Sequence, residues 1–235
     1  MGEFIGMKKI TILLIFFLAT IFRTDLYTDE AKKTIAILDF SNNSLINKEK
    51  HASLSQGLAE IMVTELSKIQ SLQLVERQKI NALIQEMQLS QSGIISEHAG
   101  VQVGKLLGAH FLVFGSYMIS FNNKIRVDIR IVEVETGVTI KAEEVTDKVT
   151  KLFEIIKKLN EKITKDLNIE LTKQEEKSMK ETNTSLDVIS SFSEGLEYED
   201  LNKTDEAKKM YLKTLEKDPE FEPAKKRLKE LSNQN

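Results

Sequence analysis

The residues best suited to chemistry form a polar cluster, Glu76-Arg77-Gln78-Lys79, within the stretch LVERQKINALIQEM at 74–87. Glu76 has the group of a general acid, and Arg77 has that of an electrostatic clamp. A single charged pair between a strand and a helix is, however, more often an ion pair that holds the corner. Glu76, close to the start of the following helix, also suits the positive end of the helix dipole. The pattern therefore favours a structural corner at Glu76 and Arg77.

A second candidate is Gly100-Val-Gln-Val-Gly104-Lys105, which has the glycines and the lysine of a phosphate-binding loop. The interval between the glycines is one residue too short, and Leu106 stands where the loop needs a serine or threonine for its metal ion. We therefore expect this segment to be a helix that packs against a sheet, and we expect no cofactor.

Few other residues have the chemistry of a metal ligand or a nucleophile. His51, His98 and His110 are scattered, without the spacing of a metal site. Asp39 ends an apolar strand, where sites on α/β sheets often lie, but no second acid accompanies it. The absence of cysteine excludes disulfides, thiolate zinc sites and the modified cysteine of a lipoprotein. The sequence thus predicts no metal, no catalytic residue and a protein that is not an enzyme.

The composition is that of a globular protein with a real core. The chain has 235 residues, of which 41% are hydrophobic and 29% charged. This length suggests one domain of ordinary size and a smaller second part. A formal net charge of -3 gives no reason to expect a nucleic-acid partner, because phosphate binders usually carry a basic excess.

The start of the chain has the pattern of a secretory signal. Lys8 and Lys9 precede the apolar run ITILLIFFLATIF at 10–22, and the sequence then turns polar. This run is shorter than the roughly 20 apolar residues of a membrane-spanning helix. Residues 1–24 are therefore predicted to be a signal peptide. A short N-terminal anchor is the alternative, because no A-x-A cleavage motif is present.

Hydrophobic periodicity outlines an α/β sandwich with a mixed sheet. Helices are followed by strands that form an antiparallel meander, which a last helix closes. Asn122-Asn123 separates two of these strands and suits a tight hairpin turn. Strands are expected at 33–40, 71–77, 110–121, 124–134 and 138–146, and helices at 54–69, 78–87, 97–107 and 151–167.

The strand at 124–134 has two different faces. Ile125, Val127, Ile129 and Ile131 alternate with a charged row made by Arg126, Asp128 and Arg130. One face is therefore expected to be core and the other solvated. A charged subunit interface is the alternative for the second face, which makes Arg126 and Arg130 candidate partner-binding residues.

The end of the chain has a different pattern. The polar segment 170–183 is expected to be a linker or a frayed helix extension. Small and aromatic residues then follow at the spacing of a tetratricopeptide repeat, and 222–231 resembles its capping helix. We therefore predict a tetratricopeptide-like helical part at 184–235. The residues with the repeat's spacing are Gly195, Tyr198, Ala207, Tyr211 and Pro219.

Within this repeat, Phe192, Leu196 and Glu199 fall where tetratricopeptide proteins line a concave groove, so they are candidate partner-binding residues. The alternative is that Phe192 and Leu196 pack on the α/β domain. A single repeat with a cap cannot bury its apolar face alone, because about three repeats are normally needed. We therefore slightly favour docking on the α/β domain.

The segments from 33 to 169 resemble the CsgG family of curli production assembly and transport components, and the related TolB amino-terminal domains. The residues that carry this resemblance are IAILDFSNNS, LAEIMVTELSKIQSLQLVERQKINALIQEM, GKLLGAHFLVFGS and IRVDIRIVEVETGVTI. The resemblance implies a CsgG-like α/β domain at 33–169 and a role in assembly or secretion at the bacterial cell envelope. It also implies that the protein is not an enzyme.

The curli protein is a lipoprotein whose subunits each give two β-hairpins to an outer-membrane pore. Here the lipidated cysteine is absent, and the Asn122-Asn123 turn joins its strands without added hairpin segments. We therefore expect an exported protein that is not lipidated, in the periplasm or on the periplasmic face of the outer membrane. It would act as an assembly or secretion accessory.

Its expected partners are other envelope proteins and further copies of itself, with peripheral association with the outer membrane. The alternatives are an oligomeric secretion pore and, less favoured, a hydrolase or nucleotide-binding enzyme.

Overall fold

The structure is a computed structural model that describes residues 32–88, 95–181 and 184–233. The predicted signal or anchor at 1–24 lies outside the described residues. Within those three ranges, no helix is both long enough and apolar enough to cross a membrane.

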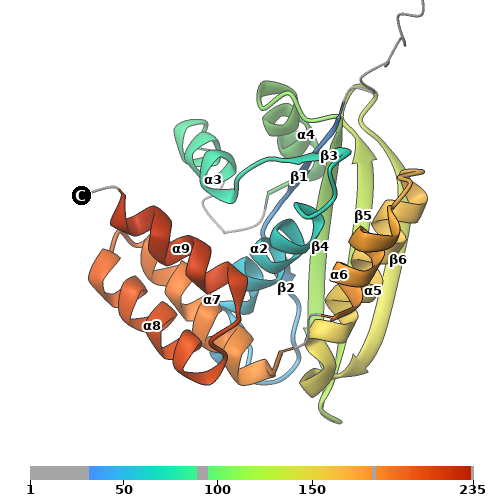
Figure 1. Cartoon of the computed structure of the whole chain (residues 1–235). Coiled ribbons are helices and arrows are strands. Elements are labelled where there is room, and N and C mark those ends of the chain that lie inside the picture. The colour runs from blue at the N-terminus through green and yellow to red at the C-terminus, as the bar shows by residue number, and fades with distance from the viewer. Residues whose placement is uncertain (1–31, 89–94, 182–183, 234–235) are drawn as a thin grey trace, which may run out of the picture. The chain divides into compact units, whose positions relative to one another are not determined.

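The described residues form the predicted α/β fold around one six-stranded mixed sheet, in the order β3-β1-β4-β5-β6, with β2 paired to β4 (Figure 1). β1 pairs in parallel with both β3 and β4, whereas β4, β5 and β6 form the antiparallel meander. This confirms the mixed-sheet α/β fold class. The strands are β1 (Lys33–Ile37), β2 (Ser41–Asn42), β3 (Leu72–Leu74), β4 (Phe111–Ile119), β5 (Lys124–Glu133) and β6 (Val138–Lys148).

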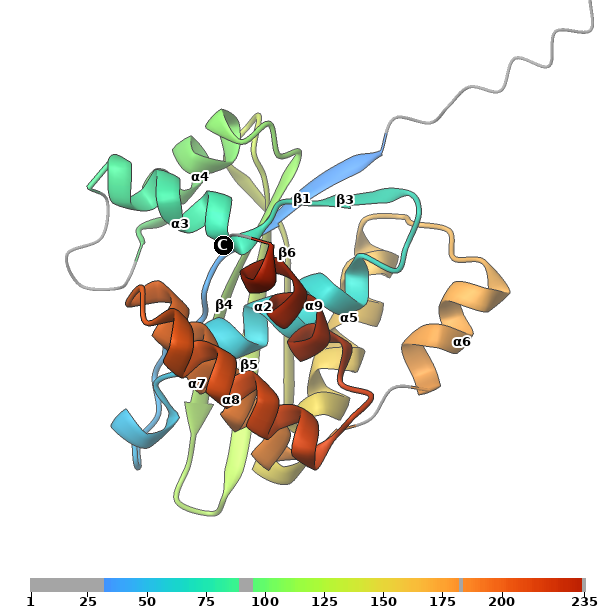
Figure 2. The same cartoon turned by 60° about the vertical axis from the view of Figure 1, so that its left-hand side comes forward.

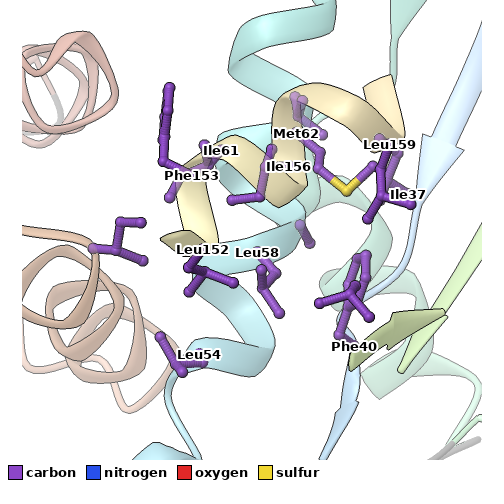
Figure 3. Close-up of a cluster of buried hydrophobic side chains, with 14 of the residues drawn as sticks. Ile37, Phe40, Leu54, Leu58, Ile61, Met62, Leu152, Phe153, Ile156 and Leu159 are labelled. Atoms are coloured by element: carbon purple, nitrogen blue, oxygen red, sulfur yellow. The ribbon is translucent and has the colours of Figure 1, made fainter. Parts of the chain in front are cut away.

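The main core lies between the sheet and two helices, α2 (Leu54–Leu66) and α5 (Leu152–Asp166). Side chains alternate across a strand, so Ile35 and Ile37 of β1 enter this core. Figure 3 shows Ile37 meeting side chains of α2 and α5 in this cluster. Almost every residue of α2 is buried, because the helix is packed on several sides at once.

A smaller core covers the opposite face of the sheet. It includes Ala36 and Leu38 with side chains of α3 (Arg77–Glu86) and α4 (Glu97–Leu106). On α4, a Cβ added at Gly100 would lie 2.6 Å from the ring of Phe114. The glycine therefore lets the helix approach the sheet closely. This confirms the prediction that the segment with the phosphate-loop-like glycines is a helix that packs against the sheet.

The hairpin between β4 and β5 is closed by a tight turn, as predicted. Ser120 N donates to Lys124 O at 2.9 Å, and Asn123 adopts a φ of 57°, which asparagine tolerates. Two short 3-10 helices complete the α/β part. They are η1 (Glu49–His51), before α2, and η2 (Val149–Lys151), which leads into α5.

Three helices at the end of the chain cover the outer side of α2, which Figures 1 and 2 show between them and the sheet. The crossing of α2 and α7 is close, because a Cβ at Gly57 would lie 1.8 Å from Ser193 Oγ. Gly195 likewise leaves room for the buried Tyr211. The helices are α7 (Leu186–Asp200), α8 (Thr204–Lys217) and α9 (Glu222–Ser232). Their assignment as a tetratricopeptide-like part stays a prediction.

Much of the segment 170–183, expected to be a linker or a frayed helix, is helix α6 (Lys173–Glu181). Its start has a capping box, in which Thr172 Oγ1 accepts from Glu175 N at 3.2 Å and Glu175 Oε2 accepts from Thr172 N at 2.7 Å. Glu175 Oε1 also accepts from Gln70 N at 2.9 Å, which ties α6 to the loop before β3. These backbone N–H groups lower the pKa of Glu175.

Replacing Glu175 with alanine should lower the free energy of unfolding by about 1 kcal/mol, because two backbone donors lose their acceptor. The lowered pKa makes this contribution complete above the ordinary pKa of 4.5 and lost as the pH falls through the folded-state value. Urea unfolding at pH 7 and at acidic pH measures both effects. Glu176→Ala, at the exposed neighbouring position, is the control and should have little effect. Equal losses in the two variants would contradict the capping role.

Candidate functional site

The polar corner singled out in the sequence is built around one buried cation. Arg77 is the first residue of α3, which follows β3 after Val75 and Glu76, and only 2% of its side chain is exposed. Its Nη1 and Nη2 each donate to a carboxylate oxygen of Asp200 at 2.9 Å, and Nη1 also donates to Asp39 Oδ2 at 3.3 Å. The planar guanidinium suits this arrangement, because its parallel N–H groups match a carboxylate. Arg77 therefore joins three segments: the end of β1, the start of α3 and the end of α7.

The charges of this corner shift the pKa values of its members. Burial by itself lowers the pKa of Arg77, but Asp39 and Asp200 reverse this and raise it above its ordinary value. Burial raises the pKa of Asp39, and Arg77 opposes that rise only in part. A further buried carboxylate, Glu60 of α2, contributes its negative charge to the same corner. Arg77 is thus charged at any ordinary pH, and Asp39 and Asp200 both pair with its single guanidinium group.

The expected ion pair between Glu76 and Arg77 is not formed among the described residues. Glu76 points outward, with 60% of its side chain exposed, and its nearest partner is Lys79 at 3.3 Å. Adjacent residues in extended backbone point to opposite sides, and Glu76 still has that conformation (φ -64°, ψ 133°). Only Arg77 therefore holds the corner, and it does so through distant carboxylates that the sequence pattern did not indicate.

A second buried ion pair lies within the C-terminal helices. Arg227 of α9 pairs with Glu199 of α7, and 5% and 7% of the two side chains are exposed. Tyr211 donates its hydroxyl to Glu199 Oε1 at 2.5 Å, and burial raises the pKa of that tyrosine. Glu199, a candidate groove residue, is therefore occupied by contacts within its own chain.

The other two groove candidates also pack inside the chain. Phe192 and Leu196 are 0% exposed and belong to the same apolar cluster as α2. The ring of Phe192 lies 5.6 Å from that of Tyr211 and 5.3 Å from that of Phe221, between centroids. Phe192 and Leu196 are therefore docked within the chain, the arrangement that the sequence slightly favoured over an open groove. A partner could reach these side chains only if the helices moved apart.

Arg126 and Arg130, the remaining candidates, lie on the open face of the sheet, where 45% and 52% of their side chains are exposed. Arg126 pairs with Asp128 at 2.6 Å and with Glu144 of β6, while Arg130 pairs with Glu97 of α4 at 2.7 Å. Exposed ion pairs of this kind stabilise a fold only weakly, because water screens the two charges. They leave the two arginines free to exchange partners.

A cavity of about 980 Å³ opens beside the Arg77 corner. It lies at the carboxyl end of β1, and its lining includes Asp39 and Asp200. In the sheet, β3 lies on one side of β1 and β4 lies on the other. Ligands of α/β sheets commonly bind at such a switch point, where the strand order changes direction. Among the residues that line this cavity, Asp39 is the one that the sequence indicated as a possible site residue.

No group of three or more potential metal ligands occurs in the described part of the chain. His110 has a structural contact, because its Nδ1 accepts from Thr34 N at 2.9 Å between β4 and β1. The fold and its polar groups thus define an α/β protein that carries ion-paired corners, an open charged sheet face and a cavity beside Arg77.

One family model matches part of this chain. Residues 23–126 match the family model described as "Curli production assembly/transport component CsgG". The resemblance predicted from the sequence is therefore confirmed over that segment. No curated protein matches the chain.

Solved structures that are similar to this chain include an LpoB domain, a TolB protein and a PelC dodecamer. The LpoB C-terminal domain from Escherichia coli is 18% identical, covers 50% of this chain and 84% of its own, and has a TM-score of 0.39. TolB from Acinetobacter baumannii is 12% identical, with 59% and 29% covered and a TM-score of 0.39. The PelC dodecamer from Paraburkholderia phytofirmans is 11% identical, with 60% and 90% covered and a TM-score of 0.39. None is close enough to transfer a function to this chain.

Truncating Asp200 to alanine should lower the free energy of unfolding by about 3 kcal/mol, because Arg77 would keep its charge and lose its bidentate partner. Glu76→Ala, which removes the exposed carboxylate beside Arg77, should lower it by less than about 1 kcal/mol. Chemical denaturation of both variants gives the comparison. If the Glu76 variant were the less stable of the two, Arg77 would not be the residue that holds this corner.

Proposed function

We propose that this protein is exported to the bacterial cell envelope and acts there through protein–protein contacts, as an accessory in assembly or secretion. Its location is the periplasm or the periplasmic face of the outer membrane, and it is not lipidated. The observation that carries the proposal is the match of residues 23–126 to the CsgG family, whose description names assembly and transport. The signal-like pattern at 1–24 supports export.

The proposed organisation has a CsgG-like domain at 33–169 and a tetratricopeptide-like helical part with its cap at 184–235, connected through 170–183. The domain supplies the contact surface, and the helices complete its core. The proposed activity includes no catalytic step and no cofactor.

The open face of the sheet is the surface that we assign to partner contacts. In its charged row Arg126 and Arg130 are exposed and Asp128 is half-buried, whereas the opposite face of β5 is buried by the core. The ion pairs along the row stabilise little, so a partner with carboxylates can replace them at small cost. Envelope proteins and further copies of this chain, which also carries exposed Glu144 on the neighbouring β6, are the proposed partners.

Cell fractionation tests export. The full chain should be found outside the cytoplasm, whereas a variant that lacks residues 7–24 should stay inside, because it has lost Lys8, Lys9 and the apolar run. A full chain that remains entirely in the cytosol with residues 7–24 intact would contradict the envelope location.

Charge reversal tests the contact surface. The double variant Arg126→Glu/Arg130→Glu should lose most cross-linking to envelope proteins, or to itself, because the exposed cations of the sheet face become repulsive to acidic partners. Lys225→Glu/Lys226→Glu is the matched control, since those two side chains are 36% and 45% exposed on α9 and also make surface ion pairs. Cross-linking and light scattering of both variants, with circular dichroism to confirm folding, give the result.

Unchanged cross-linking in the Arg126/Arg130 variant would remove the sheet face from the proposal. Stable, stepwise ion conductance of purified protein in planar bilayers would contradict the accessory role and favour the pore alternative.

A further inference from the structure

The cavity beside the Arg77 corner has the size and walls of a ligand site. Its volume of about 980 Å³ falls at the upper end of the range of roughly 300–1,000 Å³ that is usual for small-molecule sites. Phe40, Ile84 and Phe114 supply apolar surface. Gly115 allows this shape, because a Cβ there would lie 2.2 Å from the ring of Phe40.

Between these apolar side chains lie neutral polar groups, mostly carboxamides. Gln56 comes from α2, and Asn81 and Gln85 come from α3, so two helices on opposite faces of the sheet contribute. Carboxamides orient a ligand by hydrogen bonds without adding charge.

Two acceptors of the lining have no hydrogen-bond partner among the described residues. They are Asp39 Oδ1 and Gln56 Oε1, and both are buried. An unsatisfied buried acceptor destabilises the fold, so both atoms favour a bound group that donates hydrogen bonds.

The charges of the lining leave a negative excess. Lys48 and Glu49 are both exposed at the rim and offset each other. Deeper in the site, Asp39 and Asp200 share the single guanidinium of Arg77, so one carboxylate charge is not compensated. Burial is the main cause that raises the pKa of Asp39, Arg77 opposes this rise, and the charge of Asp200 adds to it.

We propose that this cavity binds a cation that donates N–H groups and is carried on an apolar stem, the chemistry of an arginine or lysine side chain. The cation would donate to Asp39 and Gln56, and its stem would contact Phe40 and Ile84. That the cation belongs to a side chain of a partner protein rests on the proposed function. That the cavity binds a cation of this chemistry does not rest on it.

Binding is tested by NMR titration of the ¹⁵N-labelled purified protein with Nα-acetylarginine amide and Nα-acetyllysine amide. Saturable shifts are expected at the side-chain amides of Gln56, Asn81 and Gln85. The neutral probe Nα-acetylglutamine amide should give much smaller ones. No saturable shift with either cation, or equal shifts with the neutral probe, would overturn the proposal.

Charge variants at Gln85 separate binding from folding, because this residue is exposed on α3 and also lines the cavity. Gln85→Glu should tighten binding of Nα-acetylarginine amide and Gln85→Lys should weaken it, with about tenfold between the two affinities. Glu86→Lys is the control, since Glu86 is exposed one residue further along and does not line the cavity. Equal affinities in the two Gln85 variants, or an effect of Glu86→Lys as large as that of Gln85→Lys, would reject the site.

The source of the cation is distinguished by a third probe, the blocked tripeptide acetyl-Ala-Arg-Ala-amide. Tighter binding than that of the single residue supports a protein segment as the occupant, and equal binding supports a free small cation. A protein that binds these probes but fails the fractionation test would retain this site and lose the proposed function.

Discussion

One ion-paired corner holds together segments that are far apart in the sequence. Arg77 contacts Asp39 at the end of β1 and Asp200 at the end of α7, with only 2% of its own side chain exposed. A buried guanidinium is tolerated only where carboxylates compensate its charge, so the position of each segment depends on the other two. The same compensation is incomplete on the carboxylate side, and this gives the adjacent cavity its negative character. Structural support and the ligand chemistry that we propose thus come from a single arrangement.

The second constraint is the burial of α2, which connects the fold to the proposed function. Because α5 and the sheet cover one side of this helix and α7 covers another, the apolar residues of the C-terminal helices are used within the chain. Phe192 and Leu196 therefore stabilise the fold and offer no surface to a partner. The charged face of β5 stays exposed, and the cavity lies where Asp200, at the end of α7, meets the α/β domain.

Periodicity in the sequence was enough to predict most elements of this fold. Alternation of Ile125, Val127, Ile129 and Ile131 identified the core face of β5, and Asn122-Asn123 identified its turn, because both features are local. The Arg77 corner was not predictable in the same way, since Asp39 and Asp200 lie 38 and 123 residues away and no periodicity connects them. Thr172 and Glu175 have the spacing of a capping box, which indicates the start of helix α6. The polar composition of the segment favoured a linker instead, so the helix was not predicted with certainty.

The enclosure of α2 also affects the order in which the protein acquires its structure during synthesis. The helix is translated more than a hundred residues before α7, whose Ser193 rests against Gly57. Until the last helices emerge from the ribosome, one side of α2 has no cover, and the nascent chain exposes apolar surface. This delay would suit the export that we propose, because a polypeptide that cannot complete its core early stays in the unfolded state that translocation through a narrow channel requires.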